Sequence, residues 1–416
     1  MGEDPQSRQR FDTVVIGGGL TGLALACAVA GAGPSPSFAV AVVERQPPAA
    51  LLAAPYDGRV TAVAPGSRRL LEAAGVWRHL GEAAAQPILD MVVRQGFSPV
   101  GVRYGSAQAG GEALGYIVEN RHLRQALLAR AAELPGLMLL APAEVAEVEP
   151  GPSLATVRLT DGAALSTPLV AVCEGRGGRT RERLGIATRA WSYRQTGIVC
   201  TLRHDQHPHG GLAVERFFPD GPFARLPMPG GHRSSLVWAL DDRLAADVRR
   251  LDDRAFLAEA AERFGDDLGP LELDGPRWHH PLSLVLADSY TAPRAALLGD
   301  AARGIHPIAG QGWNLALRDV ASLAEIAVDR LRLGLDPGDA QALARYAAWR
   351  RFDGATLAAV TDGLNRLFAN DLLPLRALRE AGLALVDRAP PAKRFFMRHA
   401  MGLAGELPRA MRGLPL

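Results

Sequence analysis

The alternation of apolar and polar positions predicts a strand, a helix and a second strand near the start of the chain. Residues 11–16 are a short apolar run, residues 20–30 are alanine-rich and apolar, and residues 38–43 are apolar again. Two runs of strand length around one of helix length are typical of a βαβ unit. Residues 13–43 carry no charge and are long enough to cross a bilayer, but six glycines and two prolines among them favour the buried βαβ unit.

The pattern then changes to one rich in strands before helical periods return. Apolar runs of strand length occur at residues 88–93, 100–104, 155–159, 169–172, 197–202, 213–218, 223–227, 234–240, 278–286 and 295–298. Segments with a helical period are residues 67–77, 121–134, 255–264, 312–333 and 341–368.

This order of segments predicts an α/β fold, in which a Rossmann-like domain is interrupted by β-rich insertions. We expect the nucleotide-binding domain to comprise residues 1–86, 112–184 and 288–340. We expect a β-sheet substrate domain from residues 87–111 and 185–287, followed by a C-terminal helical region at residues 341–416.

Composition excludes several classes of function. The chain has 416 residues, 48% of them hydrophobic, and a net charge of +2, which gives no reason to expect nucleic-acid binding. Three isolated cysteines predict neither a disulfide framework nor a metal site and fit a reducing compartment. Because we see no secretory signal before the first strand, we expect a cytoplasmic protein.

Lysine is almost absent, since Lys393 is the one lysine among 46 basic residues. No G-x-x-x-x-G-K-[ST] loop is therefore present, and no lysine in the body of the chain could form a Schiff base. The motifs H-E-x-x-H and G-x-S-x-G are not found where a metalloprotease or hydrolase would need them. Kinases, P-loop ATPases and pyridoxal enzymes are excluded.

A glycine turn joins the first strand to the first helix. Gly17, Gly19 and Gly22 satisfy G-x-G-x-x-G, and Glu44 ends the second strand 22 residues later. In a dinucleotide site these glycines allow the tight turn, the approach of a pyrophosphate and close packing of helix on strand, while the acid meets the ribose hydroxyls. The helix N-terminus favours the phosphate charge.

A second glycine segment lies nearly 300 residues later. Residues 295–298 predict a strand that leads into Asp300, and residues 307–312 predict a glycine-containing loop before a helix. The acid is placed to bind hydroxyls such as a flavin ribityl chain, and the helix N-terminus to stabilise the negative pyrimidine end of a reduced flavin. Alone, the segment could be an ordinary strand, loop and helix; together with the first turn, it favours a flavin site.

Residues 299–319, Gly-Asp-Ala-Ala-Arg-Gly-Ile-His-Pro-Ile-Ala-Gly-Gln-Gly-Trp-Asn-Leu-Ala-Leu-Arg-Asp, resemble the flavin signature of class A flavoprotein monooxygenases. From residue 306 onward the segment is similar in particular to the ubiquinone-biosynthesis hydroxylases of the UbiH/UbiF type. The resemblance extends over residues 10–365 and includes residues 57–63, 67–77, 114–121, 215–222 and 281–282.

The resemblance implies an FAD-binding domain of the glutathione-reductase type and assigns roles to matching residues. Those implied to bind or border FAD are Gly17, Gly19, Leu20, Thr21, Gly22, Glu44, Arg45, Arg59, Arg121, Asp300, Pro307, Gly310, Gln311, Gly312, Trp313 and Asn314. Arg59 near the flavin or substrate and His306 as a base are the catalytic candidates. His306 could instead simply bond to backbone.

Two positions depart from the family pattern. Arg303 stands where the family has the histidine that ends G-D-A-A-H, and we expect this bulky cation near the flavin edge. Glu174 stands where the family has aspartate before Gly175, and the usual serine that follows is missing.

The family reaction implies FAD reduced by NAD(P)H or by a protein donor. Oxygen then forms a C4a-hydroperoxyflavin, whose distal oxygen is transferred to the aromatic ring of a polyprenylated phenol or quinol intermediate of ubiquinone biosynthesis. Other quinone-biosynthesis proteins are candidate partners. Two alternatives stay open: a different flavin oxidoreductase such as an isoprenoid reductase, and a non-catalytic or weakly active component of a quinone-biosynthesis complex.

The end of the chain combines basic and apolar residues. Residues 388–416 contain six basic residues and one acid, with Phe395, Phe396 and Met397 between them. Such a segment could lie on an anionic membrane as a peripheral contact at its inner face. It could equally pack on the body of the protein with a solvated basic face.

Overall fold

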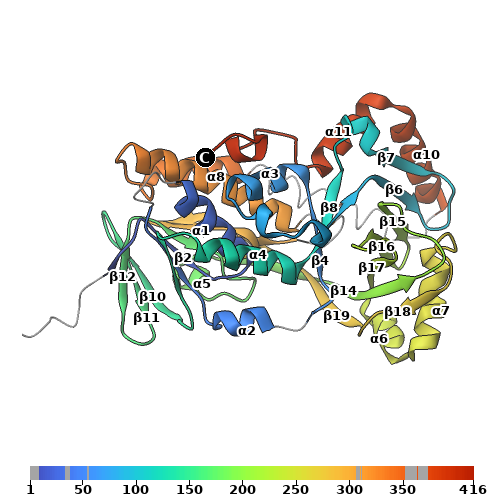
Figure 1. Cartoon of the computed structure of the whole chain (residues 1–416), viewed down its shortest axis with the longest axis horizontal. Helices are drawn as coiled ribbons and strands as arrows, with labels where there is room; N and C mark the ends of the chain where they lie inside the picture. Colours follow the sequence, from blue (N-terminus) through green and yellow to red (C-terminus); the bar gives the residue numbers. More distant parts are fainter. Residues whose placement is uncertain are drawn as a thin grey trace, which may run out of the picture.

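The computed structural model describes residues 9–32, 38–53, 56–305, 310, 312–351, 363 and 373–416. The molecule is elongated, with a parallel sheet and its helices towards one end and a large, mostly antiparallel sheet at the other (Figure 1). In the part that the structure describes, no helix is long and apolar enough to cross a membrane.

The parallel sheet has six strands in the order β20-β21-β13-β2-β3-β9. Its strands are β2 (Thr13–Ile16), β3 (Val40–Val43), β9 (Leu137–Leu140), β13 (Val170–Val172), β20 (Thr291–Ala292) and β21 (Ala295–Leu297). Every residue of β2, β3, β13 and β21 is buried, as expected for parallel strands covered on both faces. The predicted βαβ unit is confirmed, because β2 and β3 pair in parallel on either side of one helix.

That helix, α1 (Leu20–Ala32), has no charged residue and is buried from Gly22 to Ala30. Because its surface is apolar all round, the helix belongs in the core and has no polar face to turn to solvent. It packs against α4 (Asn120–Ala132) and against α8 (Gly312–Arg332), the helix of the second glycine segment. The two predicted nucleotide segments therefore share one core.

Two smaller sheets complete this end of the molecule. One has the order β1-β12-β11-β10, from β1 (Gln9–Arg10), β10 (Val145–Pro150), β11 (Ala155–Leu159) and β12 (Ala164–Thr167). The other is β4-β8-β5, from β4 (Val60–Val63), β5 (Ala85–Ile88) and β8 (Gly115–Glu119). Strands β4 and β8 lie between the parallel sheet and the large sheet in Figure 1.

The large sheet has nine strands in the order β22-β19-β14-β17-β16-β15-β6-β7, with β18 paired to β14. They are β6 (Asp90–Gln95), β7 (Gly101–Gly105), β14 (Thr188–His204), β15 (Leu212–Phe218), β16 (Gly221–Pro227), β17 (Arg233–Asp241), β18 (Leu271–Leu273), β19 (Trp278–Ala287) and β22 (Arg303–Gly304). Most of these strands were expected from alternating apolar positions. The domain boundaries stay a prediction, and β22 lies within the expected nucleotide-binding segment although it pairs with the large sheet.

One face of the large sheet packs on α6 (Asp242–Arg250) and α7 (Asp253–Phe264) through a cluster that contains Phe223, Trp238 and Phe256. Side chains of Asp241 and Asp252 cap these helices. The remaining helices are α2 (Pro48–Ala53), α3 (Pro65–Ala73), α5 (Thr180–Arg183), α10 (Leu373–Arg388) and α11 (Pro390–Ala400), and residues 340–351 are also helical. Most of the helix predicted at residues 341–368 lies outside the described residues.

Candidate functional site

The first glycine turn has the close approaches that its motif predicts. Gly17 has φ +102°, and a Cβ there would lie 2.9 Å from the carbonyl of Cys173, which follows the neighbouring strand β13. A Cβ on Gly22 would overlap the carbonyl oxygen of Gly17. Larger residues at either position would push α1 away from the sheet, so the glycines fix the position of the helix N-terminus.

Glu44 follows β3 and turns back to this loop. Its Oε2 accepts the N–H of Gly18 at 2.7 Å, and its Oε1 accepts the N–H of Gln46 at 2.9 Å. Each carboxylate oxygen has a second lone pair, so hydroxyl donors can still bind the half-buried group. Arg45 beside it is exposed.

The space above the turn fits a dinucleotide. A Cβ on Gly19 would meet no atom within 4 Å, whereas those of Gly17 and Gly22 would meet backbone. Leu20 and Thr21 begin α1 and are only half-buried, and the first N–H groups of a helix have no intrahelical acceptor. Open space beside free N–H groups and a nearby carboxylate is the donor and acceptor set that the diphosphate and ribose of FAD require.

The second glycine segment lies directly against the first. A Cβ on Gly299 would lie 3.2 Å from Oγ1 of Thr21 and 3.2 Å from Cβ of Ala316 on α8. Asp300 follows and is exposed, so its carboxylate is available beside the turn. Residues almost 280 positions apart thus form one site.

Arg176 was not among the residues predicted for the site, and it contacts Asp300. Its Nε lies 3.1 Å from Oδ2 of Asp300, and its two Nη atoms donate to the carbonyls of Ser283 and Ile305. Arg176 therefore links the loop after β13 to β19 and to the residues after β22. Because it engages Oδ2, the other oxygen of Asp300 is left for a ribityl hydroxyl.

Arg303 is part of a buried charged cluster, and its position relative to a flavin stays a prediction. Its side chain is buried and pairs with Asp319 of α8 at 2.5 Å, while its guanidinium stacks over Tyr290. Asp319 also accepts from Nε of Arg350 at 2.8 Å and from the N–H of Gly299 at 3.0 Å. Burial alone would lower the pKa of Arg303, but Asp319 raises it above its ordinary value. Arg303 thus stabilises the loop of Asp300 through Asp319, which also binds the N–H of Gly299.

The other departure, Glu174, also has a local role. Its Oε2 accepts the N–H of Thr180 at 2.9 Å, which caps the short helix α5. A Cβ on Gly178 would collide with the side chain of Glu174, so the glycine that replaces the usual serine makes room for the longer acid.

The start of α8 is fixed by Asn314. Its Oδ1 accepts the N–H of Ala64 at 2.9 Å, and its Nδ2 donates to the carbonyl of Ala62 at 2.7 Å and to that of Gly310 at 3.3 Å. Asn314 therefore positions the helix N-terminus against β4 and does not itself offer a free group. The indole Nε1 of Trp313 is buried and has no hydrogen-bond partner among the described residues, and Gly312 begins the helix. His306, Pro307 and Gln311 lie outside the described residues.

Arg59 and Arg121 lie together beside the ends of β4 and β8. Arg59 pairs with Asp57 at 2.5 Å, and its carbonyl accepts the N–H of Asn120. Arg121 lies 2.6 Å from Glu119 and stacks over Tyr56. Burial and then the charge of Arg59 lower the pKa of His280 on β19. The two arginines thus face the large sheet, and their contact with a flavin stays a prediction.

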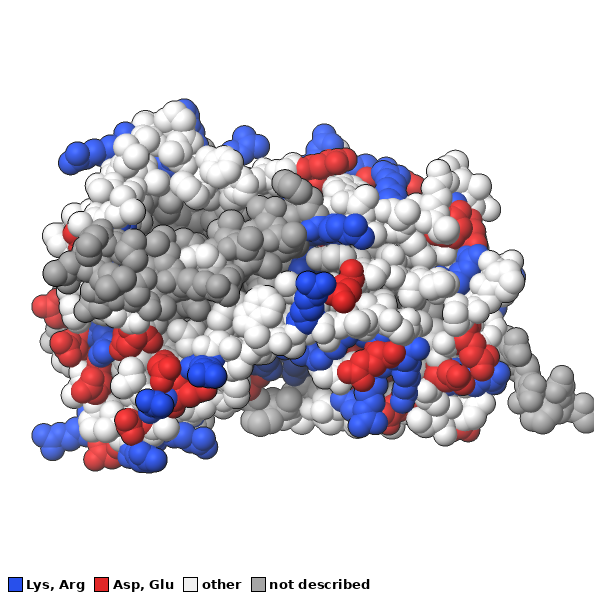
Figure 2. Space-filling view, turned by 180° about the vertical axis from the view of Figure 1, so that it is seen from behind, with Lys and Arg blue, Asp and Glu red and all other residues white. Residues whose placement is uncertain are grey.

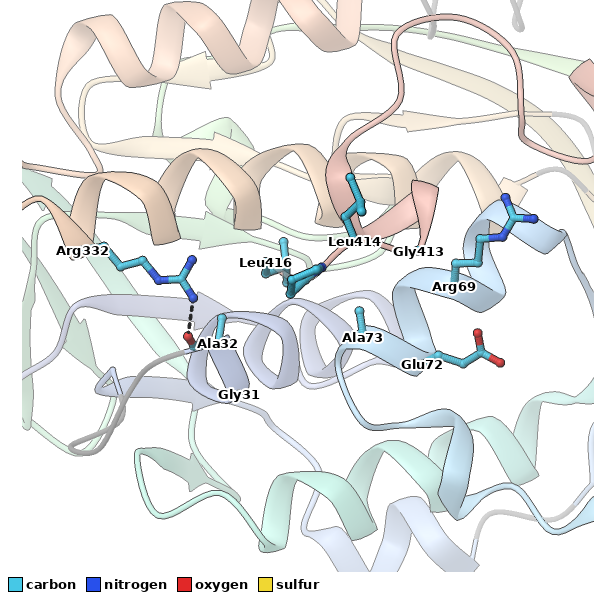
Figure 3. A pocket seen from close by; sticks show the side chains of 10 residues that line it. Gly31, Ala32, Arg69, Glu72, Ala73, Arg332, Gly413, Leu414 and Leu416 are labelled. Carbon is cyan, nitrogen blue, oxygen red and sulfur yellow. Dashed lines mark hydrogen bonds between the residues drawn. The ribbon is translucent and has the colours of Figure 1, made fainter.

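A separate pocket of about 470 Å³ lies at the far end of α1. Figure 3 shows it between Gly31 and Ala32, Glu72 of α3, Arg332 of α8 and the last residues of the chain. Since α1 rises about 1.5 Å per residue, this pocket is well removed from the glycine turn at the helix start. It is not part of the nucleotide site.

The comparisons with known proteins agree with this geometry. The model of a family described as "FAD binding domain" matches residues 10–352. A ubiquinone hydroxylase of Rhodospirillum rubrum, UbiL, is 48% identical over 408 residues, which are 97% of this chain and 93% of that protein. The chain belongs to this FAD-binding family, in the branch that contains the ubiquinone hydroxylases.

Two further proteins match at lower identity. The 3-demethoxyubiquinol 3-hydroxylase of Escherichia coli is 31% identical over 401 residues, covering 95% of this chain and 100% of that one. Among solved structures, p-nitrophenol 4-monooxygenase PnpA from Pseudomonas putida has a TM-score of 0.76 at 18% identity, covering 96% of this chain and 99% of that one. This likeness confirms the predicted fold. FAD is the cofactor of this chain, and the residues of the two glycine segments fit it.

Proposed function

We propose that this chain is an FAD-dependent monooxygenase that hydroxylates the aromatic ring of a polyprenylated phenol or quinol in ubiquinone biosynthesis. The observation that carries the proposal is the junction of the two glycine segments at Thr21 and Gly299 in a chain 48% identical to a ubiquinone hydroxylase. The relative supplies the substrate class, and the junction supplies a place for the cofactor.

The protein's part in this reaction is to bind, orient and exclude water. FAD, when bound, supplies the activation of oxygen. The turn at Gly17–Gly22 would hold its diphosphate, Glu44 its ribose and Asp300 its ribityl hydroxyls. The N-terminus of α8, fixed by Asn314, would lie at the flavin ring and stabilise negative charge there. The large sheet would cover the ring and keep water away from it.

We propose NAD(P)H as the reductant. An absorbance spectrum of the purified protein tests the site first, because bound flavin is coloured and bleaches on anaerobic reduction. We expect NAD(P)H to bleach it and air to restore it. A protein that stays colourless after incubation with FAD would overturn the proposal, whereas bleaching by dithionite but not NAD(P)H would overturn the donor alone.

Oxygen uptake distinguishes an enzyme from a flavin-binding component without catalytic activity. We expect uptake that depends on a prenylated phenol and yields a product heavier by one oxygen atom. Stoichiometric hydrogen peroxide with no hydroxylated product from any phenol would contradict the assigned reaction.

We also propose that α10 and α11 contact a membrane surface from which the lipid substrate enters. Leu378, Leu385, Phe395 and Phe396 are between 48% and 69% exposed. The side chain of Met397 is buried on the opposite face, so one side of α11 packs on the body of the protein while the other is free. In Figure 2, where this end lies at the upper left, blue side chains project among white ones.

Co-sedimentation with anionic vesicles tests this contact. We expect the full chain to bind and the double substitution Phe395→Ser with Phe396→Ser to weaken binding. The matched control is Leu333→Ser with Leu335→Ser, which changes two equally exposed apolar residues after α8. Equal loss in both variants, or no binding by the unaltered chain, would contradict a specific membrane face.

A further inference from the structure

Strand β15 carries one acidic residue on the face that points away from α6 and α7. Side chains alternate along a strand, so Ala213, Glu215 and Phe217 share one face and Val214, Arg216 and Phe218 share the other. Phe218 packs in the cluster with α7, which fixes the second face as the helix-covered one. Glu215 must therefore point to the opposite side.

That opposite side faces the nucleotide-binding end of the molecule. Ala213 packs in a cluster that also contains Ile117 of β8 and Ala62 of β4. Ala62 in turn lies 3.2 Å from where a Cβ of Gly310 would be, and its carbonyl accepts from Asn314. Ala213, two residues before Glu215 on the same face, thus belongs to the cluster that contains Ala62, and Ala62 lies beside the start of α8.

Two polar groups on this face have no hydrogen-bond partner among the residues that the structure describes. Glu215 has no hydrogen bond or ion pair with any described residue, and it is half-buried. Its strand partners are Val93 and Ala224, which cannot bond to it. Gln95, which pairs with Phe217 on the same face, is 7% exposed, and its Oε1 is buried without a partner. Buried polar groups are normally satisfied, so the buried amide oxygen of Gln95, on the same face as the unpaired carboxyl of Glu215, indicates a polar ligand.

The charged and titratable groups nearby do not neutralise Glu215. Arg216 and Arg94 point to the other face, and Arg225 pairs with Asp267 there. Tyr104 on β7 is on the same face, two strands away, and burial raises its pKa to about 12. Burial alone raises the pKa of Glu215 from 4.5 to about 7. A carboxyl of this kind exchanges a proton readily near neutral pH.

We propose that Glu215 binds the ring hydroxyl of the substrate, together with Gln95, and accepts its proton. This rests on the proposed function, because it needs a phenolic substrate between the large sheet and the start of α8. The O–H bond of the phenol breaks, the proton forms an O–H bond with Glu215, and the electron pair stays on the phenol oxygen. The ring becomes more electron-rich at the carbons ortho and para to that oxygen, where hydroxylation occurs.

The test uses the FAD-loaded full chain and three variants. Glu215→Gln keeps the shape but cannot accept the proton, and Glu215→Asp keeps a carboxylate on a shorter side chain. Glu272→Gln makes the same change at an exposed residue of the same sheet, where Glu272 pairs with Arg203. The flavin spectrum and the melting temperature of each variant report whether folding and FAD binding are intact.

We expect kcat/KM of the unaltered chain to rise through a pKa near that of Glu215. Glu215→Gln should lose this rise and about 10²–10⁴-fold in rate, as is usual for a lost general base. Glu215→Asp should recover part of the rate, and Glu272→Gln should retain the full rate and pH profile.

A series of phenols with decreasing pKa gives a second readout. The ratio of unaltered to Glu215→Gln rates should shrink as the phenol becomes more acidic, because such a phenol is ionised before it binds. A constant ratio across the series, or an unchanged pH profile in Glu215→Gln, would overturn the role of Glu215. Absence of hydroxylation of every phenol by the unaltered chain would instead overturn the proposed function.

Discussion

Two carboxylates in this protein differ in the partners that surround them. Asp319, in the nucleotide-binding core, is 0% exposed and accepts from Arg303, Arg350 and the N–H of Gly299. Glu215, on the large sheet, has no such contact with any described residue. With two arginines and one backbone N–H bound to it, Asp319 holds the loop of Asp300 in place. Among the described residues, no donor binds the carboxyl of Glu215, and burial destabilises its charged form.

The contrast separates groups that build the site from groups that are available to a ligand. Buried charge is tolerated when opposite charge and donors surround it, whereas an isolated buried carboxylate keeps its proton to a higher pH. A departure from a family motif, such as Arg303, therefore need not change the chemistry. An acid without a partner, outside the flavin signature, is a stronger candidate for a chemical role.

Removing the charge of Asp319 should have the largest effect. Asp319→Asn leaves Arg303 buried without a counter-charge, and breaking a buried pair in this way costs about 3–5 kcal/mol. Chemical unfolding of the FAD-free protein would measure the loss. A loss under 1 kcal/mol would mean that this cluster does not hold the loop of Asp300.

Removing the charge of Glu215 should have the opposite sign and depend on pH. The folded pKa, about 7, is above the ordinary value of 4.5, so the folded state binds more protons between these values and loses stability as pH rises through that window. Glu215→Gln removes this penalty. We expect equal stability at pH 4.5 and a gain of about 1–3 kcal/mol for the variant at pH 8. A gain of the same size at both pH values would contradict the raised pKa.

Asp300 lies between these extremes, since one arginine contacts it and both side chains are partly exposed. Arg176→Ala should change stability little. It should weaken FAD binding about tenfold, or ~1.4 kcal/mol, because Asp300 loses the group that orients it. Flavin fluorescence titration measures this. Arg189→Ala is the control, because Arg189 lies 3.1 Å from Asp288 in another surface pair, and equal effects would exclude a specific role for Arg176.

The smallest effect is expected for Glu272, which is exposed and pairs with Arg203. Glu272→Gln should leave the unfolding midpoint unchanged at both pH 4.5 and pH 8, since solvent screens this pair. A pH-dependent gain like that of Glu215→Gln would show that the effect is general to the sheet.

Much of the flavin site could be predicted because it depends on local spacing. The positions of Gly17, Gly22 and Glu44 follow from a strand, a turn and a helix in sequence order; the structure brings them together, and their contact with FAD stays a prediction. Arg303 could not be placed in this way, because its partners are Asp319 and Tyr290, which no local pattern connects to it. Arg176 was missed for the same reason. One feature of the sequence could have singled out Glu215. Side chains alternate along a strand, so this acid shares a face with the apolar residues Ala213 and Phe217.

The sequence by itself determined the βαβ unit, the two glycine segments and the alternating strands of the large sheet. These features follow from backbone geometry and hydrophobic period, which act over a few residues. Only the tertiary structure decided that Thr21 meets Gly299, that Arg303 pairs with Asp319, and that Glu215 lies on the sheet face opposite α6 and α7. Which charges are paired and which are left for a ligand depends on packing between distant segments, and a single sequence does not record those distances.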